Sequence, residues 1–435
     1  MKKVREVWAV KELRRKLLFT AMALILFRLG CMIPVLFVNP NVLRWSLFAG
    51  NGNMFDFLNM VSGGALSQCS LFALGISPYI NASIVMQLLC VAIPRLEAVR
   101  KETNGKKQME KYTYLLSLVL SVLLAGAYTL VLARFGALQY NSGAAMWVSG
   151  LAVMVQFVVG SQGLYWLSKK IDTKGIGNGV SVIIFAGVLT NWNSILAFFR
   201  LFQKAVLVHG ISDVTVATMG VEVMLLVLWI ATCFNGGEYR IPIQYSGRQT
   251  NNAMLKSSNS YIPIKLMASG ALPAIFASTV ISIPQTIGLF WGAEKRPELI
   301  DFLLGLNVQS AAGMILYVAL IVFFNHFYVS SQYDAVEMAN QLRANGGSIP
   351  GWRPGKPTIE YLEKVFRDMT RVGSAALAVL VCIPMIAQFV LGPDAVPFLG
   401  TSVLILTSCA SEFFSQVKSH LAARSFRGKK SLIEF

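Results

Sequence analysis

Charged residues are scarce in this chain. Of its 435 residues only 14% are Asp, Glu, Lys or Arg, whereas 55% are apolar, and its mean hydropathy is +0.59. A water-soluble globule of this size needs more polar groups to cover its surface. The composition therefore excludes a soluble globular protein and predicts a chain that lies in a bilayer.

The sequence also lacks the motifs of metal and nucleotide chemistry. Its three histidines are isolated, no His-Glu-x-x-His pattern occurs, and no two of its six cysteines have Cys-x-x-Cys spacing. We therefore expect no zinc site, no disulfide framework and no cofactor. No Gly-x-x-x-x-Gly-Lys-Ser/Thr phosphate loop is present either. The chain is not expected to be an enzyme, and any work of transport would have to be driven by a partner or a gradient.

What the chain has in quantity is long apolar runs. A stretch of about 20 apolar residues is long enough to cross a bilayer as a helix. Ten such stretches predict an all-α membrane protein with ten transmembrane helices, near residues 17–38, 72–93, 112–134, 147–168, 179–199, 216–235, 262–284, 310–329, 371–391 and 396–416.

The positions of the basic residues predict the orientation. A net charge of +17 would suggest a nucleic-acid partner in a soluble protein, but most of the 38 Lys and Arg residues fall in the termini and in alternate connecting segments. By the positive-inside rule, the N- and C-termini and those segments are cytoplasmic. Arg28 is an exception within the first predicted span, where its long side chain can snorkel to the outer surface.

Two apolar segments in opposite halves of the chain carry the same interruption. Pro78–Ser83 and Pro273–Ser278 both read Pro-x-Ile-x-Ala-Ser, and each falls in the second span of a five-span half. An odd number of spans per half makes the halves face opposite ways, so we expect an inverted repeat of residues 1–199 and 200–435. Matched interruptions favour a transport pathway, and two ordinary kinked helices are the alternative.

A segment between the first two spans, residues 55–68, is too short and too polar to cross a membrane. One interpretation is a re-entrant helix enclosed by protein, with Gly63 and Gly64 as its hinge. The alternative is an interfacial helix on the outer surface.

Two long cytoplasmic loops are expected at about residues 236–261 and 330–371. In the first, Ile and Tyr alternate with polar residues over 238–248, which is typical of a short strand or hairpin arm. In the second, the turn-rich stretch 346–357 would hold Trp352 and Arg353 at a protruding tip. A solvated turn is the usual meaning of such a loop, but Trp and Arg are also enriched in binding hot spots.

Five segments in the matching order make the chain resemble the SecY family, the channel-forming subunits of bacterial protein-secretion translocases. The resemblance covers nearly the whole chain. It rests on SGGALSQCSLFALGISPYINASIVMQLL at 62–89, GIGNGVSVIIFAG at 175–187, RIPIQY at 240–245, YIPIKLMASGALPAIFAS at 261–278 and GGSIPGWRPGK at 346–356.

The resemblance implies a protein-conducting channel in the bacterial cytoplasmic membrane. It would pass unfolded, signal-bearing polypeptides and release transmembrane segments sideways into lipid. The implied fold has ten helices in two pseudo-symmetric inverted halves of five, with a short re-entrant plug helix at about residues 55–70 and a lateral gate between the second and seventh spans. The implied partners are SecE and SecG, the SecA motor ATPase, the ribosome, the translocating preprotein and membrane lipid. No direct nucleic-acid recognition is implied apart from contact with ribosomal RNA.

The resemblance also assigns roles to individual residues. The pore ring would consist of Ile80, Ile84, Val180, Ile184, Ile275 and Ile405. The plug would include Phe57, Ser62, Gly63, Gly64 and Ser67. The lateral gate would be lined by Ser77, Asn81, Ser83, Gln87 and Ser278. SecA or the ribosome would dock on Arg240, Arg248, Trp352, Arg353 and Lys356. Independently of the family, the first two pairs of ring residues are spaced i, i+4, so each pair shares one helix face, as aliphatic pairs in ordinary helix packing also do.

The chain departs from the family pattern at two of these places. Met267 stands where the family has Asn in the entry motif of the seventh span, and Val180 stands where Ile is usual. The first departure has three interpretations: looser gating, compensation by Asn81, or an accessory member of the family that serves a restricted set of substrates. A multi-pass solute carrier is the third hypothesis, although Glu222 and Glu412, its best candidate proton sites, lie toward the ends of their predicted spans.

Overall fold

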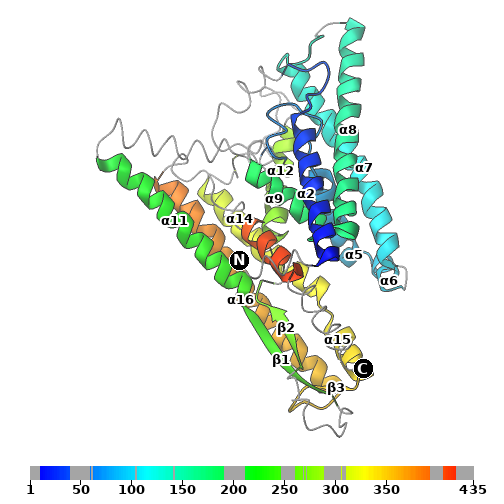
Figure 1. Ribbon diagram of the computed structural model, residues 1–435, viewed down its shortest axis with the longest axis vertical. Helices are drawn as coiled ribbons and strands as arrows, with labels where there is room; N and C mark the ends of the chain where they lie inside the picture. Colours follow the sequence, from blue (N-terminus) through cyan, green and yellow to red (C-terminus); the bar gives the residue numbers. More distant parts are fainter. Residues whose placement is uncertain are drawn as a thin grey trace. The chain divides into compact units, whose positions relative to one another are not determined.

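The computed structural model describes residues 10–39, 59, 62–102, 105–140, 143–190, 211–245, 260–267, 269–270, 272–288, 305, 310–391 and 405–417 (Figure 1). Two of the predicted site residues, Phe57 and Arg248, lie outside these residues, as do parts of the fifth and tenth predicted spans. The chain divides into two compact units. The first comprises Met1–Val208, Thr279–Gln309 and Cys409–Phe435, and the second comprises His209–Ser278 and Ser310–Ser408.

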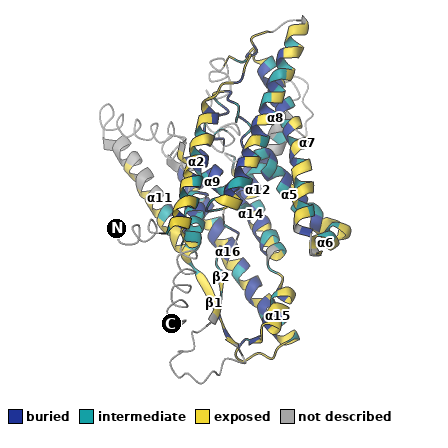
Figure 2. Ribbon diagram, turned by 45° about the vertical axis from the view of Figure 1, so that its right-hand side comes forward, coloured by how far each residue is buried: buried dark blue, intermediate teal, exposed yellow. Residues whose placement is uncertain are grey.

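The described part of the first unit is helical. Its elements are α2 (Lys11–Met32), α5 (Ser77–Ala92), α6 (Pro94–Lys101), α7 (Gly105–Arg134), α8 (Gly143–Lys174) and α9 (Gly179–Thr190). α5 packs against α7, α7 against α8, and α8 against both α2 and α9. These helices are buried where they face one another and exposed elsewhere (Figure 2).

The outward face of α8 is apolar and exposed. It carries Trp147, Val148, Leu151, Val155, Val159 and Trp166, each more than half exposed. The two tryptophans lie about 28 Å apart along a regular helix, close to the thickness of the hydrocarbon core. Trp is enriched at both membrane interfaces, so this face is typical of a lipid-facing helix.

The second unit combines helices with a small sheet. Its elements are α11 (Ile211–Gly236), β1 (Glu238–Tyr245), β2 (Ser260–Lys265), α14 (Ala311–Gln332), α15 (Ala335–Ala344), β3 (Gly347–Ser348) and α16 (Lys356–Leu391), and α12 (Leu272–Gly288) begins in it. α11 and α14 both pack against α16. The strands are antiparallel in the order β2-β1-β3.

Both prolines of the sheet occupy positions that need no N–H group. Pro242 pairs with Tyr261, and Pro263 pairs with Arg240. Residue pairs in an antiparallel ladder alternate between hydrogen-bonded and non-hydrogen-bonded pairs. The two proline pairs are two positions apart, so both are of the same kind, and proline fits the non-hydrogen-bonded kind because it has no N–H to donate to the neighbouring strand. Pro263 also interrupts the outer edge of β2, which discourages pairing with another chain.

A separate hydrophobic core lies under this sheet. Ile241 and Ile243 point to one face of β1, as the alternating sequence requires, and they pack with Leu362, Val365 and Phe366 of α16. This explains why α16 begins at Lys356, well before the predicted span at 371–391: its first turns cover the sheet instead of crossing apolar surroundings.

The fold confirms a mostly helical chain and corrects several details. Among the described residues, four helices are long and apolar enough to cross a membrane, and a fifth span results if α5 and α6, which are bent by 108°, count as one.

The strand predicted in the first long loop is present as β1. The predicted all-α fold class is therefore incomplete, because the second unit also contains a three-stranded sheet. The seventh span was predicted from residue 262, but residues 260–265 pair with β1 and form β2.

The two Pro-x-Ile-x-Ala-Ser motifs start helices instead of kinking them. Pro78 lies in the first turn of α5, and Pro273 is the second residue of α12. Proline suits this place because its missing N–H would have no partner in the first turn. Three residues before each proline is a glycine, Gly75 or Gly270, and both have a φ of +58°.

Candidate functional site

The segment between α2 and α5 is joined to the end of α2 by backbone hydrogen bonds. Val35 N donates to Cys69 O, and Leu71 N donates to Ile33 O, both at 2.9 Å. Pro34 and Ser70 form an isolated antiparallel bridge between these bonds. We call residues 62–72 the buried segment, because Ser62, Ala65, Leu66, Cys69 and Ser70 are each no more than 2% exposed.

The buried segment is a series of turns. Gly63 and Gly64 have φ values of +72° and +82°, which glycine adopts without strain. Asn59 holds two successive turns through its backbone and its side chain. Its carbonyl oxygen accepts a hydrogen bond from Gly64 N at 2.7 Å, and its Oδ1 accepts one from Ser67 N at 2.9 Å. A helix was predicted at about residues 55–70. Asn59 is helical, but residues 62–72 are not, since paired glycines with positive φ cannot continue an α-helix.

α7 and α8 enclose the buried segment. Tyr128 of α7 donates from its hydroxyl to Leu66 O at 3.3 Å, and Phe157 of α8 lies in the same hydrophobic core. At Gly160 of α8, an added Cβ would overlap the carbonyl oxygen of Leu71. Residues 62–72 are therefore enclosed by protein, as the re-entrant interpretation requires, and do not form an interfacial helix on the surface.

Arg28 contacts this segment, which the sequence did not predict. Its Nη1 donates to Gly63 O at 3.0 Å, and one turn further along α2, Cys31 Sγ donates to Ser62 O at 3.5 Å. The side chain is half-buried. The guanidinium therefore has a carbonyl partner within the protein, which the snorkelling prediction did not include.

Gly30 allows the two parts to approach. A Cβ at this position would overlap the ring of Phe72, which in turn stacks on Phe27 with ring centroids 6.3 Å apart. Arg28, Gly30 and Phe27 thus act together to fit α2 against the buried segment.

The residues predicted for the pore ring are buried or half-buried. In the first unit, Ile80 and Ile84 of α5 are 6% and 4% exposed, Ile184 of α9 is 2% exposed, and Val180 is half-buried. In the second unit, Ile275 of α12 and Ile405 are 5% and 2% exposed. None of the six lies on an exposed face such as that of α8.

The residues predicted for the lateral gate are half-buried, and three of them bond within their own helices. Gln87 Nε2 donates to Ser83 Oγ at 3.2 Å within α5, and Ser278 Oγ donates to Ile275 O at 2.8 Å within α12. Ser77 and Asn81 are half-buried on α5.

The predicted docking residues lie on and beside the sheet of the second unit. Arg240 of β1 forms an ion pair with Glu238 at 3.8 Å and lies over the ring of Tyr261 of β2, 4.8 Å from its centroid. An Arg held flat on an aromatic ring keeps a fixed direction and remains available to a partner.

The predicted tip between β3 and α16 is a tight series of turns. Gly346, Gly351 and Gly355 all have positive φ values, and Thr358 Oγ1 donates to Arg353 O at 2.8 Å. Trp352 stacks on Tyr361 of α16 with centroids 4.9 Å apart. Trp352, Arg353 and Lys356 are exposed, as a tip requires, and the stacking makes Trp352 a rigid part of the surface.

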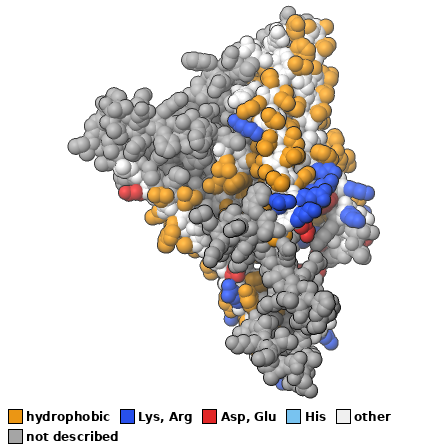
Figure 3. Space-filling view, in the orientation of Figure 1, with side chains coloured by type: hydrophobic (Ala, Val, Ile, Leu, Met, Phe, Trp, Pro, Cys, Tyr) orange, Lys and Arg blue, Asp and Glu red, His pale blue; other side chains and the backbone are white. Residues whose placement is uncertain are grey.

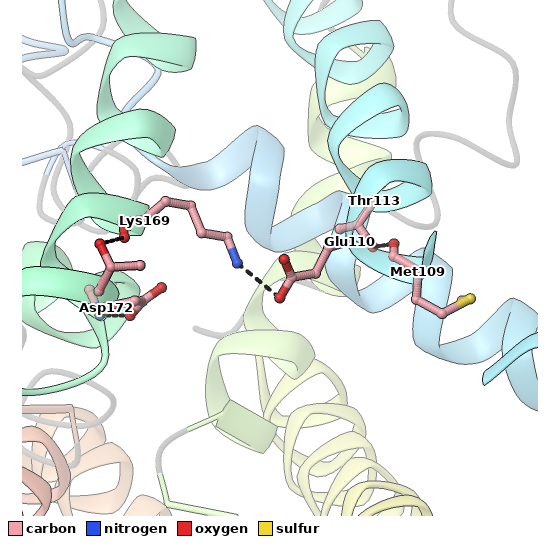
Figure 4. Close-up of polar contacts among 7 residues, drawn as sticks. Met109, Glu110, Thr113, Lys169 and Asp172 are labelled. Carbon is pink, nitrogen blue, oxygen red and sulfur yellow. Dashed lines mark hydrogen bonds and ion pairs between the residues drawn. The ribbon is translucent and has the colours of Figure 1, made fainter. Parts of the chain in front are cut away.

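The first unit has a charged cluster at one end of α7 and α8 (Figure 4). Lys169 Nζ of α8 lies 3.4 Å from Glu110 Oε1 of α7. Asp172 Oδ1 accepts from Gly179 N at 2.6 Å, which ties the end of α8 to the start of α9. Lys170 lies over the ring of Trp166. Figure 3 shows Lys and Arg side chains gathered at this end of the unit, next to a largely hydrophobic face.

Among the described residues, no group of three or more His, Cys, Asp or Glu side chains could hold a metal ion. The described residues offer buried aliphatic side chains, an enclosed turn segment and an exposed basic surface.

Comparisons with known proteins point to one family. The family model described as SecY matches residues 70–414. The chain is 34% identical to the protein translocase subunit SecY of Streptomyces scabiei, over 96% of this chain and 97% of that protein. It is 32% identical to the protein translocase subunit SecY of Aquifex aeolicus, over 98% of each.

Solved structures show the same fold. The chain matches the structure of a protein conducting channel with a TM-score of 0.65 and 18% identity, over 93% of this chain and 92% of that one. It matches a SecY protein whose plug domain stabilises the closed state of the translocation channel and maintains a membrane seal, also with a TM-score of 0.65, with 20% identity and the same coverage. It matches Sec61 in the canine ribosome-channel complex from the endoplasmic reticulum with a TM-score of 0.62 and 18% identity, again with the same coverage.

Proposed function

This chain belongs to the SecY family, and we propose that it is the subunit that forms the protein-conducting channel of a Sec translocase. In this role it passes unfolded, signal-bearing polypeptides across the membrane and releases transmembrane segments into lipid. The observation that carries the proposal is the identity of about a third to protein translocase subunits over nearly the full length of both chains. The family is one of translocation channels, and the chain is not proposed to be an enzyme.

We propose ten spans in two inverted halves, residues 1–199 and 200–435. The repeated start of α5 and α12 supports this proposal. Each helix begins at a Pro-x-Ile-x-Ala-Ser motif, and each motif follows a glycine with a φ of +58° at the same spacing. Repeats of this kind place the transport site between broken helices near the midplane of the membrane.

The pore ring would work by excluding water. Ile80, Ile84, Val180, Ile184, Ile275 and Ile405 offer no ligand to an ion, so an ion entering the ring would lose its hydration without replacement. Flexible aliphatic side chains can still fit around the varied side chains of a passing polypeptide. The burial of five of the six residues supports an inward-facing role.

The buried segment would be part of the plug. Ser62, Gly63, Gly64 and Ser67 lie in it, and Arg28 holds it through a hydrogen bond to a carbonyl oxygen. A turn segment can leave its site by local unfolding, at the cost of these polar bonds and of the packing of Leu66 and Cys69, whereas a continuous helix would have to move as a whole.

The lateral gate would lie between α5 and α12. Sorting there needs no ATP, because ten leucine-like residues favour lipid over water-filled surroundings by about 5 kcal/mol on the insertion scale. Ser83, Gln87 and Ser278 bond within their own helices, so opening the gate would leave these bonds intact.

Docking of a motor or a ribosome would use the sheet and tip of the second unit. Arg240, Trp352, Arg353 and Lys356 form an exposed basic and aromatic surface there, and Arg248 would add to it. We propose SecA and the ribosome as partners on this surface, and SecE and SecG as further subunits. We also propose the bacterial cytoplasmic membrane as the location, and by the positive-inside rule both termini would lie in the cytoplasm.

Met267 favours a second candidate, an accessory channel with a restricted set of substrates. It is 4% exposed and stands where a polar residue is usual in the family, so the start of α12 lacks one polar group. Export of a broad set of signal-bearing precursors by this chain would exclude that candidate.

Reconstitution tests the main proposal. The chain is placed in proteoliposomes with SecE, SecA and ATP, and a signal-bearing precursor is added. We expect part of the precursor to become resistant to external protease, and a matched precursor without its signal to remain digested. A chain that inserts and binds its partners but protects no precursor would contradict the proposal.

A further inference from the structure

The chain that leads into α12 is fastened by polar contacts within the second unit. Leu266 N donates to Gly237 O at 2.9 Å, next to the end of α11. Ser269 is 3% exposed, and its hydroxyl donates to Asn325 Oδ1 of α14. We call Leu266, Met267, Ser269 and Gly270 the α12 entrance, because α12 begins at Leu272.

Asn325 joins the α12 entrance to a third helix. It is 2% exposed. Its Nδ2 donates to Ser374 Oγ at 2.8 Å and to Thr370 O at 3.4 Å, both in α16, while its Oδ1 accepts from Ser269. A carboxamide has one acceptor atom and one donor group, and both are used here across three parts of the chain.

The backbone of the entrance also lies unusually close to α16. At Gly373, an added Cβ would lie 2.6 Å from the carbonyl oxygen of Leu266. Only glycine permits this approach. The entrance is thus held on one side by the hydrogen bond to Asn325 and on the other by close backbone contact with α16.

The same face of α14 holds the first turns of α12. Tyr317 donates from its hydroxyl to Ala274 O at 3.3 Å, and Phe324 meets Phe276 edge to face with centroids 5.8 Å apart. Tyr317, Phe324 and Asn325 are seven and eight residues apart, so they share one side of the helix. α14 therefore acts as a bracket for the start of α12.

The polar character of this contact has a consequence for motion. An apolar contact loses little free energy when two helices slide by a fraction of an ångström, whereas a buried hydrogen bond is directional and leaves unsatisfied groups when it breaks. A hydrogen-bond network of this kind favours one discrete position of the α12 entrance over slightly displaced positions.

We propose that Asn325 is a positioning residue that holds the start of α12 in its resting position and so sets how strong a signal must be to open the lateral gate. The inference rests on the proposed function, in which α12 borders that gate. It goes further in assigning to Asn325, on the neighbouring helix α14, control of the signal strength that opens the gate.

The test compares two variants with one control. Asn325→Leu removes the carboxamide. Ser269→Ala removes only the hydroxyl that donates to Asn325 Oδ1. Thr370→Val is the matched control: its Oγ1 donates to Phe366 O within α16, and Asn325 uses the backbone oxygen of Thr370, so the network survives.

Each variant is reconstituted with SecE and SecA and given two precursors, one with an intact signal and one whose signal is shortened by polar substitutions. We expect Asn325→Leu and Ser269→Ala to raise protection of the weak-signal precursor by about five- to thirty-fold, the factor that corresponds to the loss of one or two hydrogen-bond equivalents. Thr370→Val should match the wild type, and all should transport the intact precursor.

Hydrogen exchange of the entrance amides gives a second readout that needs no precursor. Leu266, Met267 and Gly270 should exchange faster in Asn325→Leu and Ser269→Ala than in Thr370→Val. Wild-type export of the weak-signal precursor by the two variants, or an equal increase in Thr370→Val, overturns the inference. Failure of the wild type with the intact precursor would instead contradict the proposed channel function, and the exchange rates would still decide whether Asn325 holds the entrance.

Discussion

Arg28 and Gly63, 35 residues apart in the sequence, are joined by a hydrogen bond of 3.0 Å from the guanidinium to the carbonyl oxygen. A cation within a predicted span needs a partner, and a glycine with a φ of +72° can turn its carbonyl oxygen toward that cation. The contact links a charge that is costly in a membrane to the segment that we propose as part of the plug.

We expect Arg28→Leu to loosen that segment. A hydrogen bond to a charged group contributes about 1.5–3 kcal/mol, so the displaced state should be populated at least about tenfold more often. The idle channel should then conduct ions more in planar bilayers. Arg28→Lys, which keeps a donor and the charge, is the control and should conduct less than Arg28→Leu. Equal conductance of Arg28→Leu and the wild type would mean that the contact does not hold the segment.

Two glycines of α8 allow a matched test of how closely this helix packs against the buried segment. A Cβ at Gly160 would overlap Leu71 O, whereas a Cβ at Gly163, one turn further along, has nothing within 4 Å. Gly160→Ala should therefore lower the free energy of unfolding by about 1–3 kcal/mol. Gly163→Ala should leave it unchanged or raise it by up to about 1 kcal/mol. Thermal unfolding in detergent, followed by intrinsic fluorescence, separates the two; equal effects would contradict the close approach.

Cysteines at the proposed pore ring should reach a translocating chain. With a precursor stalled in the channel, Ile84→Cys and Ile184→Cys should crosslink to it, because both side chains would face the pore. Val85→Cys is the control, since Val85 is 40% exposed on another side of α5. Failure of both ring cysteines, or crosslinking of Val85→Cys alone, would count against the ring.

Reversing the charge at the tip should uncouple the motor. We expect Arg353→Glu to leave folding intact, because Arg353 is exposed, and to abolish SecA-driven secretion. Lys364→Glu makes the same change of charge at an exposed position further along α16 and should secrete normally. The comparison uses protease protection together with SecA binding. Normal secretion by Arg353→Glu would refute the assignment.

Local features of the sequence were sufficient to predict much of this fold. The scarcity of charge predicted a membrane protein, and apolar runs located the long helices, since both depend only on composition and length. The alternation around Ile241 predicted β1. The repeated proline motifs predicted two related elements, although the structure made them helix starts. The roles assigned to ring, gate and docking residues came from the family resemblance and stay predictions.

Other features depended on which parts of the chain meet in space. The sequence gives no sign that Ser260–Lys265 is a strand until β1 is present to pair with it, nor that Lys169 finds Glu110 on another helix.

Composition and hydrophobic periodicity thus determined that the chain lies in a bilayer and where its long apolar helices run, because a bilayer and a backbone act on each residue locally. Only the tertiary structure decided the partners of Arg28 and Asn325. A buried polar group is satisfied by whatever donor or acceptor the packed helices bring within about 3 Å, and that neighbour is not encoded near it in the sequence.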